Sequence, residues 1–213
     1  MPATTTQIPR NILVLGIGNV LWADEGFGVR CVETMAQTHA VPANVRLMDG
    51  GTQGLYLLPF IEDCDALIVF DAVDFGLEPG TLVTLRDRDV PAFMGAKKMS
   101  LHQTGFQDVL ATAELMGHAP DYITLIGCQP EEIEDYGGGL RAVTSAQILP
   151  AIDECIRELG RWDIGVTEGR TESGDLADIS IQRSAYEGGR PDAEDACRIG
   201  DHRFFPPAAK GRA

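Results

Sequence analysis

Positive charge is scarce in this chain. Its 213 residues include 17 Lys and Arg against 32 Asp and Glu, so the formal net charge is −15. Nucleic acids and anionic membranes are bound by cationic surfaces, and the deficit therefore argues against both as partners. The excess of acidic residues is compatible with a cationic ligand or a basic partner protein, although such an excess often serves solubility alone.

Paired cysteines and long apolar runs are also missing. The five cysteines are dispersed without a Cys-x-x-Cys motif, which is typical of reduced thiols in a cytoplasmic protein. Four of them, Cys31, Cys64, Cys128 and Cys155, lie in apolar segments and are expected in the core. No apolar run approaches the roughly 20 residues that span a bilayer, and the N-terminus lacks a basic patch followed by an apolar segment. We therefore expect a cytoplasmic protein without a transmembrane helix or a signal peptide.

One stretch, from Asn11 to Val32, predicts a strand, a turn and a helix in succession. Ile12–Leu15 is an unbroken apolar run, which suits a strand buried on both faces. Gly16–Asn19 ends the run, because Gly and Asn tolerate the backbone of a sharp turn. Beyond the turn, apolar residues recur at helical spacing. Asp24 and Glu25 then lie near the start of the helix, where its dipole favours acidic groups.

This stretch has two other interpretations. A dinucleotide-binding enzyme would use a Gly-x-Gly-x-x-Gly turn, and Gly16 and Gly18 fit that motif, but Leu21 occupies the third glycine position. Two carboxylates at a helix start would also repel a pyrophosphate, so this interpretation is disfavoured. Alternatively, Asp24 and Glu25 could serve only as a helix cap and a solvated partner of the dipole.

The rest of the chain alternates between strand and helix patterns up to about residue 160. We predict strands at Val45–Asp49, Ala66–Phe70, Thr81–Leu85 and Tyr122–Cys128, and helices at Leu55–Ile61, Phe106–Met116 and Ile148–Leu159. This alternation predicts an α/β fold, a three-layer α/β/α sandwich with a mostly parallel five-stranded sheet. The link from residue 70 to residue 81 is too short for a helical crossover, so we expect one antiparallel strand.

The predicted domain spans residues 11–161 and follows an N-terminal extension of residues 1–10. From Trp162 onward, apolar residues become sparse, and Gly, Arg, Asp and Glu alternate without a period. We expect the C-terminal tail, residues 162–213, to be disordered or loosely packed on the domain. The three glycines at 137–139 are interpreted as a flexible part of an acidic loop.

Four titratable residues are predicted to meet at one edge of the sheet. Ligands of open α/β sheets bind outside the carboxyl ends of the strands, and Glu25, Asp49 and Asp71 each follow or end a predicted strand. His102 precedes a predicted helix. Glu25, Asp71 and His102 would provide three oxygen and imidazole ligands and leave positions of a divalent ion open for substrate. The competing interpretation is that Asp71 forms a turn and His102 is a surface or cap residue.

Five segments resemble the conserved blocks of the nickel–iron hydrogenase maturation proteases, in the same order and without a missing block. The blocks are Gly16–Gly28, Asp49–Gly54, Val69–Val73, Ser100–Gln103 and Tyr122–Glu131. Any one of them would be a weak signal, and five in sequence are a strong one. The resemblance covers roughly residues 11–160 and implies an α/β/α fold. The tail beyond about residue 162 departs from the shorter members of that family.

The resemblance implies an endopeptidase that removes the C-terminal extension of the nickel-loaded precursor of a nickel–iron hydrogenase large subunit. Nickel carried by the precursor would be the recognition element, held by Glu25, Asp71 and His102. Asp49 and Asp24 are the candidates for the general base, and the family has at times been classed with aspartic peptidases. We expect the protease to act as a monomer. The alternative is a non-catalytic, nickel-sensing chaperone of the same precursor.

Overall fold

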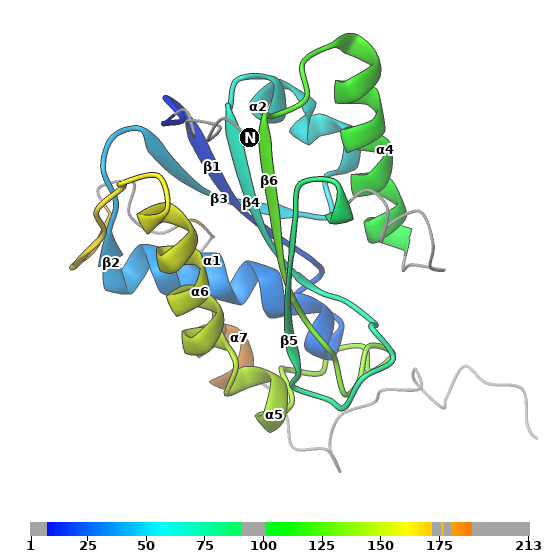
Figure 1. Ribbon diagram of the computed structural model, residues 1–213. Helices are drawn as coiled ribbons and strands as arrows, with labels where there is room; N and C mark the ends of the chain where they lie inside the picture. Colours follow the sequence, from blue (N-terminus) through cyan, green and yellow to red (C-terminus); the bar gives the residue numbers. More distant parts are fainter. Residues whose placement is uncertain (1–7, 91–100, 172–175, 177–179, 189–213) are drawn as a thin grey trace, which may run out of the picture.

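The computed structural model describes residues 8–90, 101–171, 176 and 180–188, with residues 101–105 described by their backbone alone. Its centre is a five-stranded sheet in the order β3-β1-β4-β6-β5 (Figure 1). The strands are β1 (Ile12–Ile17), β3 (Val45–Gly51), β4 (Ala66–Ala72), β5 (Leu82–Arg86) and β6 (Tyr122–Cys128). The first three and β6 are parallel, and β5 is antiparallel to β6. The predicted fold class is confirmed, including the antiparallel strand.

The antiparallel strand β5 lies at the sheet edge beside β6, not beside β4, which precedes it in the chain. Leu82 pairs with Cys128 and Arg86 with Thr124. The short link after β4 reverses the chain direction, and the chain then passes through α4 (Leu101–Met116) before β6 enters between the two strands. A connection that includes a helix is what a parallel neighbour of β4 requires.

Helices cover both faces of the sheet. On one face, α1 (Phe27–Thr38) and α6 (Ile148–Gly160) pack over the strands, with the short helix α5 (Ala142–Ser145) before α6. On the other face lie the 3₁₀ turn η2 (Gly54–Leu57), α2 (Leu58–Glu62) and α4. Val14 packs toward α1 and α6, whereas Leu13 and Leu15 pack toward α2 and α4. Because both faces are covered, β1 reads as a continuous apolar run.

Two prolines that fall within the predicted helices lie in the first turn of α2 and of α6. Pro59 is the second residue of α2, and Pro150 is the third residue of α6. The first four N–H groups of a helix have no partner within that helix, so a proline costs little there. The predicted single helix at 55–61 is accordingly a 3₁₀ turn followed by a short α-helix that begins just before Pro59.

The described residues beyond position 161 pack on the domain. Trp162 is buried against Tyr122, with ring centroids 5.7 Å apart. A two-residue strand, β7 (Thr167–Glu168), pairs with β2 (His39–Ala40), which follows α1. The helix α7 (Arg183–Gly188) comes next. Residues 189–213, which include Cys197 and much of the predicted tail, lie outside the described residues.

The four cysteines expected in the core are buried free thiols in the structure. Burial raises the pKa of Cys64 and Cys128 to about 12, which keeps both thiols protonated and unreactive. None of the helices that the structure describes is both long enough and apolar enough to cross a membrane.

Candidate functional site

The sheet order places a topological switch point between the carboxyl ends of β1 and β4. From β1, the chain passes through α1 to β3 on one side of β1, and then through α2 to β4 on its other side. Such a switch point is where ligands bind in open α/β sheets. Glu25 lies in the 3₁₀ turn η1 (Ala23–Gly26), which follows β1, and Asp71 is near the end of β4. Both predicted metal ligands therefore flank the switch point.

Glycines allow α1 to begin directly over these strand ends. A Cβ atom on Gly28 would lie 2.1 Å from the carbonyl oxygen of Phe70 and 2.3 Å from that of Ile17. A Cβ on Gly18, which has a φ of +132°, would lie 1.8 Å from the carbonyl oxygen of Glu25. These glycines serve close packing of backbone on backbone. The disfavoured interpretation as a phosphate-binding turn gains no support from this geometry.

The side chains of Glu25 and Asp71 differ in solvent exposure. The Glu25 side chain is half-buried, and burial raises its pKa from 4.5 to about 7. Asp71 is 3% exposed. Taking a carboxylate out of water penalises its charged form, and a nearby cation offsets that penalty. Two carboxylates of this kind at one sheet edge fit a hard or borderline divalent ion, which prefers oxygen and imidazole ligands.

His102 lies in the first turn of α4, and its side chain is outside the described part of the structure. The helix α4 ends just before the amino end of β6 and packs against η2, which follows the carboxyl end of β3. Its first turn therefore points toward the carboxyl edge. Among the described side chains, no three His, Cys, Asp or Glu residues assemble a metal site, so the ligand set of Glu25, Asp71 and His102 stays a prediction.

Asp49 lies on β3 opposite Gly16, on the α1 side of the sheet. Its Oδ1 accepts a hydrogen bond of 2.9 Å from the backbone N–H of Gly51. Burial raises the pKa of Asp49, and the Gly51 amide and the guanidinium of Arg30 lower it in part. A partly buried carboxylate whose pKa is raised by burial can accept a proton during catalysis. This environment favours Asp49 as the general base.

Asp24 has a different environment, because its side chain is fully buried and already hydrogen-bonded. Oδ2 accepts bonds from the backbone N–H groups of Glu131 and Glu132 at 2.8 and 3.0 Å, and Oδ1 accepts one from Arg141 at 2.7 Å. No side chain caps η1 or α1, so Asp24 is not a helix cap. Its geometry favours a structural role over that of a general base.

The acidic loop at 129–141 packs against the segment that carries Glu25. Gly137 donates to the carbonyl of Leu21 at 2.7 Å, and Ala23 donates to that of Gly138 at 3.1 Å. The rings of Trp22 and Tyr136 meet edge to face at 5.2 Å. The three glycines that we interpreted as flexible are thus part of a fixed turn, with a φ of +74° at Gly137.

Gln129 has a structural role that sequence reasoning missed. Its Oε1 accepts hydrogen bonds from the backbone N–H groups of Phe75 and Leu77, and its Nε2 donates to Asp74. The buried amide thereby fixes the loop that follows Asp71. The signal available in the sequence was only its position at the end of β6, where an uncharged polar residue follows an apolar run.

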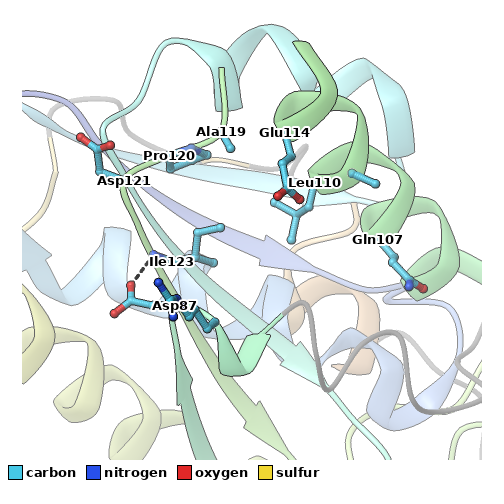
Figure 2. A pocket seen from close by; sticks show the side chains of 10 residues that line it. Asp87, Gln107, Leu110, Glu114, Ala119, Pro120, Asp121 and Ile123 are labelled. Atoms are coloured by element: carbon cyan, nitrogen blue, oxygen red, sulfur yellow. Dashed lines mark hydrogen bonds between the residues drawn. The ribbon is translucent and has the colours of Figure 1, made fainter. Parts of the chain in front are cut away.

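A separate, mainly apolar hollow lies at the opposite edge of the sheet. A cavity of about 400 Å³ lies between α4 and the start of β6, with Leu110 and Ile123 on its wall and Glu114 and Asp121 at its rim (Figure 2). Asp87 accepts a hydrogen bond from the N–H of Ile123 there. Because this edge holds the amino ends of the parallel strands, the cavity is separate from Glu25 and Asp71.

Comparisons with known proteins show which family the chain resembles. A family model described as "Hydrogenase maturation protease" matches residues 29–158. The hydrogenase expression/formation protein HupD of Rhodobacter capsulatus is 73% identical over 205 residues, which cover 96% of this chain and 98% of that protein. The hydrogenase 2 maturation protease of Escherichia coli is 42% identical over 149 residues, 70% of this chain and 90% of that protein.

A solved structure gives the same result. The hydrogenase maturating endopeptidase HybD from Escherichia coli superposes with a TM-score of 0.70 and 39% sequence identity, over 74% of this chain and 97% of that one. The strand ends that carry Glu25 and Asp71 thus belong to a fold shared with a characterised peptidase. Similarity of this extent shows that the chain belongs to the hydrogenase maturation protease family.

Proposed function

We propose that this protease removes the C-terminal extension of the nickel-loaded precursor of a nickel–iron hydrogenase large subunit. The observation that carries the proposal is the pair of carboxylates, Glu25 and Asp71, that flanks the switch point between β1 and β4. The family and the relatives' names supply the class of substrate. We place the reaction in the cytoplasm, with the protease acting as a monomer.

Nickel is part of the substrate in this proposal. Glu25 and Asp71, with His102 from the first turn of α4, would hold an ion that the precursor presents. A carboxylate and imidazole set binds such an ion without thiolates and leaves positions open. The pKa of Glu25, raised to about 7 by burial, means that binding a cation would displace its proton near neutral pH. A bound divalent ion can polarise a carbonyl or acidify water.

Asp49 is our candidate for the general base, which would deprotonate the attacking water. Its partial burial raises its pKa, and its place at the end of β3 puts it on the same edge of the sheet as Glu25 and Asp71. Asp24 would hold the loop at 129–141 against η1 and so keep Glu25 in place. An aspartic-peptidase mechanism with two carboxylates that share a proton forms no part of the proposal.

The test is cleavage of purified precursor, in nickel-loaded and nickel-free forms, followed by mass spectrometry of the subunit. We expect loss of a C-terminal peptide from the nickel-loaded form alone. Glu25→Gln and Asp71→Asn should abolish the cleavage, whereas Glu114→Gln, an exposed carboxylate on α4, should leave it unchanged. Binding of the loaded precursor without a change in mass would instead support the chaperone alternative.

A further inference from the structure

The outer edge of β3 is free of a neighbouring strand among the residues that the structure describes. β3 is the first strand in the sheet order, and its one described strand partner is β1. Ile12 donates to the carbonyl of Asn44, and Ile12 is in register with Val45. In a parallel ladder, alternate residues of a strand bond to the same neighbour. The N–H and C=O groups of Leu47 and Asp49 therefore point away from β1, along the outer edge.

A groove runs along this edge and reaches Asp49. It has a volume of about 830 Å³, and one wall is formed by the turn from Ala40 to Ala43 and by β3 up to Asp49. The opposite wall consists of Arg170, Thr171 and Leu176. An exposed strand edge in a groove is the feature that binds extended peptides by adding a strand to a sheet.

The outer wall is held in place by hydrogen bonds to the domain. Thr171 donates its N–H to the carbonyl of Ala36 at 2.9 Å and its hydroxyl to that of His39 at 2.8 Å. The N–H of Gly169 donates to the carbonyl of Thr38 at 3.0 Å. The wall lies beyond residue 158, where the match to the family model ends. The segment that follows α6 therefore adds a fixed wall to the common domain.

The charge of the groove differs from that of the chain as a whole. Its charged lining residues are Arg46, Arg170 and Asp49, two cations and one anion in a chain with a net charge of −15. The guanidinium of Arg46 lies 4.6 Å from the centre of the Phe60 ring of α2, on the α2 side of the sheet, so Arg170 is the arginine on the outer wall of the groove. A C-terminal extension always carries at least its terminal carboxylate, and arginine is well suited to bind carboxylates.

We propose that Arg170, Thr171 and Leu176, together with the outer edge of β3, form a binding groove for the precursor's C-terminal extension, which pairs with β3 as an added strand. This inference rests on the proposed function. The cleaved bond precedes the extension in the chain, and Asp49 lies at the carboxyl end of β3. The extension therefore enters at Asp49 and runs toward Val45, antiparallel to β3.

A synthetic peptide with the sequence of the cognate precursor's extension tests the pairing directly. In the full-length protein, we expect it to shift the NMR amide signals of Leu47 and Asp49. Two methylated peptides are compared, one N-methylated at the odd-numbered residues and the other at the even-numbered residues. One of them should bind about tenfold more weakly and the other as well as the unmodified peptide, because only alternate residues donate hydrogen bonds to β3. Equal binding by the two methylated peptides, or no shift of the β3 amide signals at about 1 mM peptide, would overturn the proposal.

A groove-filling variant tests the same idea on the whole precursor. Ala43 is exposed and lines the groove, so Ala43→Trp should raise KM for the nickel-loaded precursor about tenfold, with kcat within about twofold. The matched control is Ala111→Trp, an exposed residue at the cavity of Figure 2, which should change neither value. An unchanged KM for Ala43→Trp would refute the groove while wild-type cleavage still upheld the proposed function. If the wild type does not cleave loaded precursor, the proposed function fails, and the peptide experiment still decides the pairing.

Discussion

Asp24 and Arg141 are 117 residues apart in the chain, yet the buried carboxylate of Asp24 accepts a 2.7 Å hydrogen bond from the backbone N–H of Arg141. The other carboxylate oxygen accepts from Glu131 and Glu132. One side chain therefore joins the turn that carries Glu25 to the loop that follows β6. Hydrogen bonds to a buried charged group are among the stronger ones, at roughly 1.5–3 kcal/mol each.

Asp24→Asn should lower the free energy of unfolding by about 2–3 kcal/mol, because the amide NH₂ would face backbone donors in place of an acceptor. Urea unfolding followed by circular dichroism would measure the change. Asp63→Asn, at an exposed carboxylate, is the control and should have little effect. If Asp24→Asn keeps wild-type stability but abolishes cleavage, Asp24 takes part in the chemistry and the structural role assigned to it is wrong.

The stability of the protein should carry a pH signature of Glu25. The pKa of Glu25 is about 7 in the folded protein, against 4.5 for an ordinary exposed glutamate, so the folded state binds more protons between these pH values. Stability contributed by protonated Glu25 is therefore present below pH 4.5 and is lost as the pH rises through 7. Glu25→Gln should match the wild type at pH 4.5 and be more stable than it at pH 8, as measured by urea unfolding. An equal difference at both pH values would contradict the raised pKa.

His102→Ala should abolish processing of the nickel-loaded precursor while leaving the unfolding transition unchanged. The expected loss comes from the third ligand of the proposed nickel site, because two carboxylates alone would leave the ion weakly held. His118→Ala provides the matched control, since His118 is exposed just beyond the other end of α4. Cleavage at the wild-type rate by His102→Ala would remove His102 from the metal site.

Arg30→Met should destabilise the fold by roughly 3–5 kcal/mol, because it leaves Glu33 as an uncompensated buried charge. Arg30 is 2% exposed, and its Nη1 lies 2.8 Å from Glu33 and 2.7 Å from the carbonyl oxygen of Ile181. The double variant Arg30→Met/Glu33→Leu should recover much of the loss, as measured by urea unfolding. A double variant no more stable than Arg30→Met would show that the pair is not the source of the effect.

Gly28→Ala should prevent normal packing of α1, because its Cβ would lie 2.1 Å from the carbonyl oxygen of Phe70 and that backbone cannot yield easily. A loss of several kcal/mol, about 3 or more, is expected in thermal or urea unfolding. Gly160→Ala is the comparison, since nothing lies within 4 Å of a Cβ at that position in α6. It should stabilise the protein by about 0.5–1 kcal/mol. Similar effects of the two variants would argue against close packing at Gly28.

The sequence was sufficient to predict the parallel strands and to place Glu25 and Asp71 at the carboxyl edge of the sheet. Ile12–Leu15 and Ala66–Phe70 are apolar without interruption, and Tyr122–Cys128 is interrupted only by Thr124, because both faces of the sheet are covered. Once those strands were placed, the rule that ligands bind at carboxyl ends brought Glu25 and Asp71 together. The raised pKa of Glu25 and the burial of Asp71 followed from that position and needed no further sequence signal.

Contacts between distant segments could not be predicted in the same way. The pairing of β2 with β7 joins His39 to Glu168 through strands of two residues each, too short for a periodic pattern. Asp24 accepts hydrogen bonds from backbone N–H groups of the loop at 131–141, more than 100 residues away in the chain, and no local sequence pattern predicts such a contact. Arg30 lies on an amphipathic helix, where an arginine normally faces water, and only the segment around Ile181 makes it a buried residue.

The contact between Arg30 and Ile181 also bears on how longer and shorter family members diverged. A homologue whose chain stopped after α6 would have no carbonyl at this place to accept the second guanidinium bond, and the arginine would face water. Selection for arginine here would then disappear. We expect the arginine and the segment at 180–188 to be inherited together, and a comparison of long and short homologues would reveal that linkage.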